Sequence, residues 1–324
     1  MKAIRCKSYG APANLVFEET DNLEVGPKQV LVSMKACGLN FPDTLIIQGL
    51  YQFKPELPFT PGSDVAGVVK AVGDGVKHVS IGQEVFGFVP YGGLAEEVLV
   101  PANACFPKPH QMDFETAASF LMAYGTSFHA LKDRAKLKEG DTLLVLGASG
   151  GVGLAAVELG KLMGAKVIAA ASTDEKLELC KEYGADLTLN YEKEDIKTTV
   201  KEMTSGIGVD VVYDPVGGNY SESALRATAR YGSYLVVGFA AGDIPKIALN
   251  LPLLKEVEIV GVFWGSFAMK EPRANMENSM QLMKWHAEGK LRPHIHKTFN
   301  LKDSPLALEE MMKRKVMGKL VVTV

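Results

Sequence analysis

The chain has 324 residues, which is enough for two domains that each bury a core of their own. Hydrophobic residues make up 47% and charged residues 23%, and the formal net charge of -3 gives no electrostatic case for binding nucleic acid or an anionic membrane. The N-terminal residues contain no apolar signal-peptide core, and the four scattered cysteines form no Cys-x-x-Cys pair. We therefore expect a cytoplasmic protein without disulfides or a zinc cluster.

The first 110 residues are typical of a β-rich domain. Short β-branched runs, separated by Gly and Pro, occupy residues 29–36, 63–72, 83–88 and 95–100. From residue 113 the pattern changes, and apolar residues spaced three and four apart predict helix over residues 114–133.

Strands and helices then alternate along the chain. The predicted strands are 142–147, 166–171, 186–190, 210–217, 232–238 and 258–264, and the predicted helices between them are 151–164, 174–183, 194–204 and 220–229. This alternation predicts a parallel sheet with helices on both faces. The remaining predicted elements are helices 275–289 and 304–313 and strands 294–301 and 319–324. They are expected to return to the first domain.

Residues 145–154, VLGASGGVGL, fit two different motifs. The glycines at 147, 150 and 153 suit a phosphate-binding turn from strand to helix, whereas residues 147–151 also match the G-x-S-x-G elbow that exposes a nucleophilic serine. Asp210, Asp214 and His286 follow in the order that a hydrolase would need. However, a serine elbow comes after several βα units, while this strand is the first of the alternating region, where a dinucleotide fold has its glycine loop. The context favours the phosphate loop, whose helix N-terminus offers N–H groups to a pyrophosphate.

The end of the second predicted strand bears on the choice of dinucleotide. NAD-binding folds usually have Asp or Glu there for the ribose 2′-hydroxyl, but strand 166–171 runs into Ser172. A small hydroxyl followed by Lys176 leaves room for a 2′-phosphate and favours NADPH. Ser172 and Glu175 would also suit a helix capping box, and Asp174 could serve a ribose, so these alternatives stay open.

Four motifs occur in a characteristic order: GLNFPDTLIIQGLY (38–51), PFTPGSDVAGVV (58–69), GGLAEEV (92–98) and GASGGVG (147–153). With them the chain resembles, over essentially its full length, the zinc-free quinone oxidoreductase branch of the medium-chain dehydrogenase/reductase superfamily. The resemblance implies an α/β fold: a GroES-like β-rich catalytic domain (1–122 and 267–324) and a doubly wound Rossmann NADPH-binding domain (123–266).

The positions of the zinc ligands carry other residues in this chain. Zinc alcohol dehydrogenases of the superfamily read G-x-C-x-[ST]-D and G-H-E, where this chain has Asn40 and Ser63 in place of the cysteine and the histidine. Neither is a competent Zn²⁺ ligand, and Cys37 lies three positions too early and is expected in the core. His294 and His296 share a strand face but have no third ligand. We expect no metal.

Without a Lewis acid, hydride transfer needs an acceptor with its own electron sink. The leading hypothesis is therefore metal-free hydride transfer from NADPH to a quinone. Reduction of the C=C bond of enals, enones or enoyl thioesters is an alternative that needs nearly the same residues. A nucleotide-binding protein with little turnover is the alternative from another class.

The resemblance also implies roles for single residues. The implied catalytic residues are Asn40 (an amide toward cofactor or substrate), Asp43 (in the cleft beside the nicotinamide) and Tyr51 (a hydrogen bond to the acceptor oxygen or a proton relay). The implied cofactor contacts are Phe41, Pro42 and Thr126 at the nicotinamide; Gly150, Gly151 and Val152 at the pyrophosphate; Ser172, Lys176, Tyr191 and Arg314 around the adenosine phosphate; and Gly238, Phe239, Ala240, Phe263, Trp264 and Gly265 at the nicotinamide half. Trp264 is bulkier than the resemblance leads us to expect.

Residues 257–264 are apolar on both faces and are expected to form the edge of the Rossmann sheet. Because an unpaired edge strand invites association, we expect a homodimer that pairs this edge about a two-fold axis.

Overall fold

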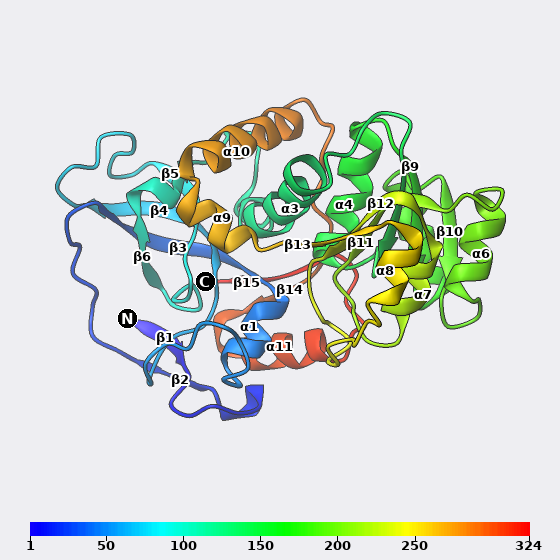
Figure 1. Cartoon of the computed structure of the whole chain (residues 1–324). Coiled ribbons are helices and arrows are strands. Elements are labelled where there is room, and N and C mark those ends of the chain that lie inside the picture. The colour runs from blue at the N-terminus through cyan, green and yellow to red at the C-terminus, as the bar shows by residue number, and fades with distance from the viewer. The chain divides into compact units, whose positions relative to one another are not determined.

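The computed structural model describes residues 1–324, which divide into two compact units (Figure 1). The first unit comprises Met1–Met122 and Pro293–Val324, and the second comprises Ala123–Arg292. The predicted boundary after residue 122 coincides with the boundary between the units, but the chain returns to the first unit at Pro293 rather than at residue 267.

The first unit is built on a mixed sheet of seven strands in the order β14-β15-β3-β4-β5-β7, with β6 also paired to β3. The strands are β3 (Gln29–Leu39), β4 (Asp64–Val72), β5 (Glu84–Phe88), β6 (Glu97–Pro101), β7 (Cys105–Pro107), β14 (Ile295–Asn300) and β15 (Lys319–Thr323). A separate pair is formed by β1 (Lys2–Arg5) and β2 (Val16–Glu19). Because β15 runs antiparallel to β3, with Leu320 opposite Leu39, the start of β15 lies beside the end of β3.

The first unit also contains three short helices: α1 (Phe41–Ile46), α2 (Phe114–Ala117) and α11 (Ser304–Met312). The sequence predictions omit α1, which begins directly after β3. The Asp43 carboxylate accepts the Asn40 backbone N–H at 2.7 Å, as in one half of a capping box. Gly38 is required just before this turn, since a Cβ there would lie 1.8 Å from the Ala118 carbonyl oxygen.

The second unit has a six-stranded, fully parallel sheet in the order β10-β9-β8-β11-β12-β13. The strands are β8 (Thr142–Leu146), β9 (Lys166–Ala171), β10 (Leu187–Asn190), β11 (Val209–Asp214), β12 (Thr228–Val236) and β13 (Glu258–Gly261). The helices are α3 (Leu121–Phe128, which begins in the first unit), α4 (Gly151–Leu162), α5 (Asp174–Glu182), α6 (Ile196–Met203), α7 (Tyr220–Ala227), α8 (Asn250–Lys255), α9 (Trp264–Lys270) and α10 (Pro272–Ala287). In Figure 1, α4 and α7 lie on opposite sides of the sheet. Strand order and helices confirm the predicted doubly wound fold.

The largest differences from the predicted elements lie after β13. The predicted strand over 258–264 ends at Gly261, and Trp264 opens α9. The predicted helix over 114–133 is interrupted and continues past α3 as a π-helix over His129–Arg134. Aromatic packing explains why α9 and α10 stay in the second unit: the His129 ring stacks on Phe267 with centroids 3.9 Å apart, and Phe128 meets Trp285 edge-on at 5.3 Å.

None of the helices combines the length and the apolar character needed to cross a membrane.

Candidate active site

A buried polar cluster lies in the first unit where β3 ends, β4 begins and β15 begins. Asn40, Asp43, Ser63, Asp64 and Lys319 are each 7% exposed or less. The Asn40 amide nitrogen donates to the Asp64 carboxylate at 3.0 Å, and the Lys319 ammonium donates to the Asn40 amide oxygen. The same ammonium lies 3.5 Å from Asp64, so one buried cation faces two buried carboxylates.

Asp43 has an altered acidity in this cluster. Burial raises its pKa to about 7, against the hydrogen bond from the Asn40 backbone and the attraction of Lys319, which lower it, while the Asp64 charge raises it further. The Ser63 hydroxyl also faces Asp43, with Oγ 3.4 Å from Oδ1. A carboxyl group with this pKa exchanges its proton in the neutral range.

Tyr51 is half-buried and packs against the core of the first unit. Burial raises the pKa of its hydroxyl, and the negative charge of Asp43 raises it further. The structure therefore places Tyr51 within the electrostatic reach of Asp43, and its hydroxyl keeps its proton at neutral pH. Phe41 and Pro42 begin α1 and are partly buried.

The cluster includes Asn40 and Ser63, the two residues that the resemblance places at zinc-ligand positions. Asn40 and Ser63 are hydrogen-bonded within it, and Cys37 is fully buried, as expected, with a pKa raised well above its usual value chiefly by burial. The structure brings together no group of three or more His, Cys, Asp and Glu side chains that could hold a metal ion.

In the second unit, β8 turns into α4 through the predicted phosphate loop. Gly147 has a positive φ of 57°, and a Cβ on Gly153 would lie 2.2 Å from the Gly147 carbonyl oxygen, so both glycines are required by the fold. A Cβ on Gly150 would meet only that oxygen, at 3.4 Å. The N-terminus of α4 has no side-chain cap and no acidic residue in its first turn, which leaves the amides around Gly151 and Val152 suited to an anion.

The residues predicted to bind the adenosine phosphate lie where β9 and β10 end. The Lys176 ammonium lies 3.3 Å from the Ser172 hydroxyl, and the Tyr191 backbone N–H donates to the Ala171 carbonyl at 3.2 Å. Ser172, Lys176 and Tyr191 thus lie close together, and their contact with the adenosine phosphate stays a prediction. The cap of α5 is Thr173, whose hydroxyl accepts from the Lys176 N–H, rather than Ser172. Arg314 belongs to the first unit, and its contact with the phosphate stays a prediction.

The acids of the serine-elbow alternative have structural partners. Asp210 accepts the Thr142 N–H at 2.7 Å, and Asp214 accepts the Val216 and Gly217 N–H groups and the hydroxyls of Ser221 and Tyr234. These bonds join strands and stabilise the turn after β11, so neither carboxylate is available to orient a catalytic histidine.

The residues predicted at the nicotinamide half follow β12 and β13. The Gly238 N–H donates to the carbonyl of Asp214 at the end of β11, and the Ala240 N–H donates to the carbonyl of Pro215 just after it. The Phe239 carbonyl accepts the Gly242 N–H within the same loop. Phe263 is 53% exposed, but the Trp264 ring is buried against Gly125 and donates to the Asn275 side chain at 3.0 Å. Its bulk therefore fills the contact between α3 and α9.

Two further predicted contacts stand beside these elements. Gly265 follows Trp264 in α9. Thr126 lies in α3. The hydroxyl of the following residue, Ser127, donates to the Val152 carbonyl at 2.8 Å. These cofactor contacts stay predictions.

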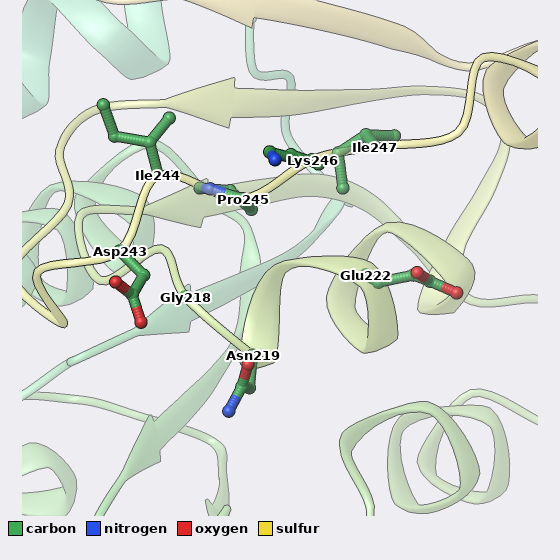
Figure 2. Close-up of a pocket in the computed structure, with 8 residues that line it drawn as sticks. All are labelled: Gly218, Asn219, Glu222, Asp243, Ile244, Pro245, Lys246 and Ile247. Atoms are coloured by element: carbon green, nitrogen blue, oxygen red, sulfur yellow. The ribbon is translucent and has the colours of Figure 1, made fainter.

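A surface pocket of about 430 Å³ lies between the loops after β11 and β12 and the start of α7. Its lining residues are Gly218, Asn219, Glu222, Asp243, Ile244, Pro245, Lys246 and Ile247. Figure 2 shows the Asp243 and Glu222 carboxylates on opposite sides of the view, so the acidic groups do not converge on one point. We assign no role to this pocket.

Three features together define a class: a β-rich unit with a buried acid near neutrality, a doubly wound sheet, and a glycine loop open to an anion. The class is that of the dinucleotide-dependent dehydrogenases and reductases. Residues 26–110 match the family model described as "Alcohol dehydrogenase GroES-like domain", and residues 151–285 match "Zinc-binding dehydrogenase".

Known proteins narrow the class. "Quinone oxidoreductase-like protein 2 homolog" of Nematostella vectensis is 40% identical over 99% of this chain and 88% of its own length. The structure of Escherichia coli quinone oxidoreductase complexed with NADPH shares 29% identity and a TM-score of 0.93, covering 100% of both chains. That of CurK enoyl reductase shares 26% identity and a TM-score of 0.91, covering 99% of this chain and 98% of the other. The chain belongs to the quinone oxidoreductase branch of the medium-chain dehydrogenase/reductase superfamily.

Sequence reasoning missed three polar residues that the structure brings to these sites. Lys319 reaches Asn40 from the other end of the chain. Asn190, at the end of β10, and Lys193, in the turn after it, contact Asp174. A lysine at the start of one predicted strand, and an asparagine at the end of another with a lysine just after it, carry no motif. Their contacts come only with the pairing of β15 to β3 and of β10 to β9.

Proposed function

We propose that this chain is an NADPH-dependent oxidoreductase that transfers a hydride to a quinone without a metal ion. The predicted cofactor is confirmed by the family and by a similar structure that contains NADPH. The observation that carries the acceptor class is the buried cluster of the first unit. In this cluster Asn40 and Ser63 take the positions that zinc ligands have in the zinc alcohol dehydrogenases. The positive charge of the cluster comes from the Lys319 ammonium. A cation bonded to Asn40 and beside Asp64 disfavours a second cation at the same place.

NADPH supplies the hydride when it is bound. The α4 N-terminus would hold the pyrophosphate with its backbone N–H groups, and Gly150 leaves space for that approach. Ser172 and Lys176 would hold the 2′-phosphate by a neutral and a charge-assisted hydrogen bond.

Residues of the first unit would supply the proton that the reduced quinone takes up. A quinone that accepts a hydride develops negative charge on oxygen, and the protonated Tyr51 hydroxyl is suited to donate a hydrogen bond to that oxygen. Asp43, with its pKa of about 7, can hold or release a proton at neutral pH and is electrostatically coupled to Tyr51. Asn40 is tied to Lys319 and Asp64 and so fixes the start of α1, which carries Asp43.

The proposal is tested by steady-state oxidation of NADPH with a panel of quinones, enones, enoyl thioesters and saturated ketones. We expect the highest kcat/KM with a quinone, and Tyr51→Phe should lower kcat about tenfold to a hundredfold while the cofactor Kd stays unchanged. Turnover of saturated ketones or plain alcohols, with none on quinones or enones, would overturn the proposal.

Reduction of a C=C bond is the second candidate, because a structure described as an enoyl reductase is similar over nearly the whole chain. A higher kcat/KM for an enone or enoyl thioester than for any quinone would favour it. A chain that binds NADPH and turns over none of the panel would instead be a nucleotide-binding protein.

We also propose a homodimer. β13 is the edge strand of the parallel sheet, and Ile259 on it is 42% exposed, while the neighbouring Leu253 and Leu254 are 74% and 77% exposed. Pairing of this edge with a second copy would cover both the strand and these leucines. Light scattering should give twice the 35.0 kDa mass of one chain, and a monomer at micromolar concentration would contradict the proposal.

A cytoplasmic location stays a prediction. All four cysteines are buried and free, so the structure contains no disulfide.

A further inference from the structure

Asp174 is an acidic residue at the point where this fold chooses between two cofactors. It is the first residue of α5 and lies two positions beyond Ser172, at the end of β9. A carboxylate at this end of the strand selects NADH when it accepts a hydrogen bond from the ribose 2′-hydroxyl, and its charge opposes a 2′-phosphate. NADPH binding therefore requires that the charge of Asp174 be directed elsewhere or balanced.

The structure shows how this is achieved. The Asn190 amide nitrogen donates to Asp174 Oδ1 at 2.6 Å, and the Lys193 ammonium donates to Asp174 Oδ2 at 2.7 Å. Each carboxylate oxygen thus has its own donor, and both donors come from the end of β10 and the turn after it. In agreement, the hydrogen bonds from Lys193 and then from Asn190 lower the pKa of Asp174.

Asn190 is itself held in place. The residue is 3% exposed, its amide oxygen accepts the Glu192 N–H at 3.2 Å, and its backbone N–H donates to the Glu194 carboxylate at 2.8 Å. Because the amide oxygen has an N–H donor, the amide nitrogen is the group that faces Asp174. Asn190 also lies opposite Ala171 in the parallel pairing of β10 with β9, one residue before Ser172. The tether is thus anchored in the sheet beside the expected phosphate position.

We propose that Asn190 and Lys193 are specificity-determining residues that hold and neutralise Asp174, so that Ser172 and Lys176 can accept a 2′-phosphate. The inference rests on the proposed NADPH dependence and adds the cause of that preference. Neither residue needs to contact the cofactor. Without the tether, the Asp174 carboxylate is free to turn toward the ribose, where it favours NADH and repels NADPH.

The experiment compares the binding of 2′,5′-ADP and 5′-AMP by calorimetry, because these probes differ in the 2′-phosphate and carry no nicotinamide. Lys193→Met is the first variant, since the Lys193 side chain is 64% exposed and its replacement leaves the core intact. Asn190→Ala is the second variant, and Asp174→Asn is combined with each. The ratio of the two Kd values in the unchanged protein is the reference.

We expect Lys193→Met and Asn190→Ala each to lower the preference for 2′,5′-ADP about fivefold to tenfold, because the released Asp174 carboxylate repels the 2′-phosphate. A tenfold change corresponds to about 1.4 kcal/mol. Asp174→Asn should restore the preference in both combinations, because no carboxylate remains to be tethered. The ratio of kcat/KM for NADPH and NADH should follow the same order.

Three outcomes overturn the inference. The first is an unchanged preference in both single variants. The second is a loss that persists in the Asp174→Asn background, which would mean that Lys193 or Asn190 acts on the phosphate directly or only on folding. The third is an unchanged protein that binds both probes equally, which would remove the proposed NADPH dependence as well. Inactivity toward quinones, in contrast, would contradict the proposed function and leave this binding result intact.

Discussion

The two candidate sites are built in opposite ways. In the first unit, the cluster around Asn40 is buried and its polar atoms bond to one another, with Lys319 balancing the carboxylates. In the second unit, the start of α4 is left without a side-chain cap or an acidic residue. The first arrangement fixes the shape and the charge of a site, whereas the second leaves backbone donors for a ligand. Changes in the first unit should therefore act on stability and proton transfer, and changes at the glycine loop should separate folding from binding.

The largest expected effect comes from removing the buried cation. Lys319→Met leaves the Asp64 carboxylate buried without its ion pair, and we expect a loss of about 3 to 5 kcal/mol in the free energy of unfolding. Denaturant unfolding measures this difference.

Lys7→Met is the matched control, because Lys7 and Glu18 form an ion pair in the first unit whose side chains are 52% and 30% exposed. This variant should lose less than about 1 kcal/mol. Equal losses in the two variants would show that the buried cluster is no more tightly coupled than a surface ion pair.

Two substitutions in the glycine loop separate folding from cofactor binding. Gly153→Ala forces a Cβ to within 2.2 Å of a backbone oxygen and should cost about 1 to 3 kcal/mol of stability. Gly150→Ala meets nothing closer than 3.4 Å, so its melting temperature should stay unchanged while the Kd for NADPH rises. Thermal melts and NADPH titrations measure the two effects. If Gly150→Ala bound NADPH as tightly as the unchanged protein, the loop would not hold the pyrophosphate.

The same contrast explains what could be predicted from the sequence. The glycine loop was predictable because Gly147, Gly150 and Gly153 act within one short turn. The alternation of strands and helices was enough to predict a parallel sheet with helices on both faces. Lys319 was not predictable, because its bond to Asn40 joins residues 279 positions apart. The burial of the Trp264 ring was not predictable either, because the ring packs against Gly125 in a contact between two helices. Such contacts depend on tertiary packing, which no local pattern encodes.

The acidity of Asp43 predicts a pH dependence of stability. The folded pKa of about 7 lies above the ordinary 3.8, so the folded state binds the proton more tightly. This contribution is fully present below pH 3.8 and is lost as the pH rises through about 7. Relative to Asp43→Asn, which does not titrate, the unchanged protein should lose about 2 kcal/mol of stability between about pH 5.5 and 7.5. Parallel stability curves for the two proteins would show that Asp43 is ionised throughout this range.

The smallest expected effect tests the central claim, which is hydride transfer to a quinone without a metal ion. The measurement is the NADPH-dependent reduction of a quinone by protein dialysed exhaustively against a chelator, together with metal analysis of the same sample. Because Asn40 and Ser63 stand at ligand positions and Lys319 provides the buried positive charge, we predict an unchanged kcat/KM and no stoichiometric zinc. Loss of activity on chelation, restored by adding zinc, would contradict the account.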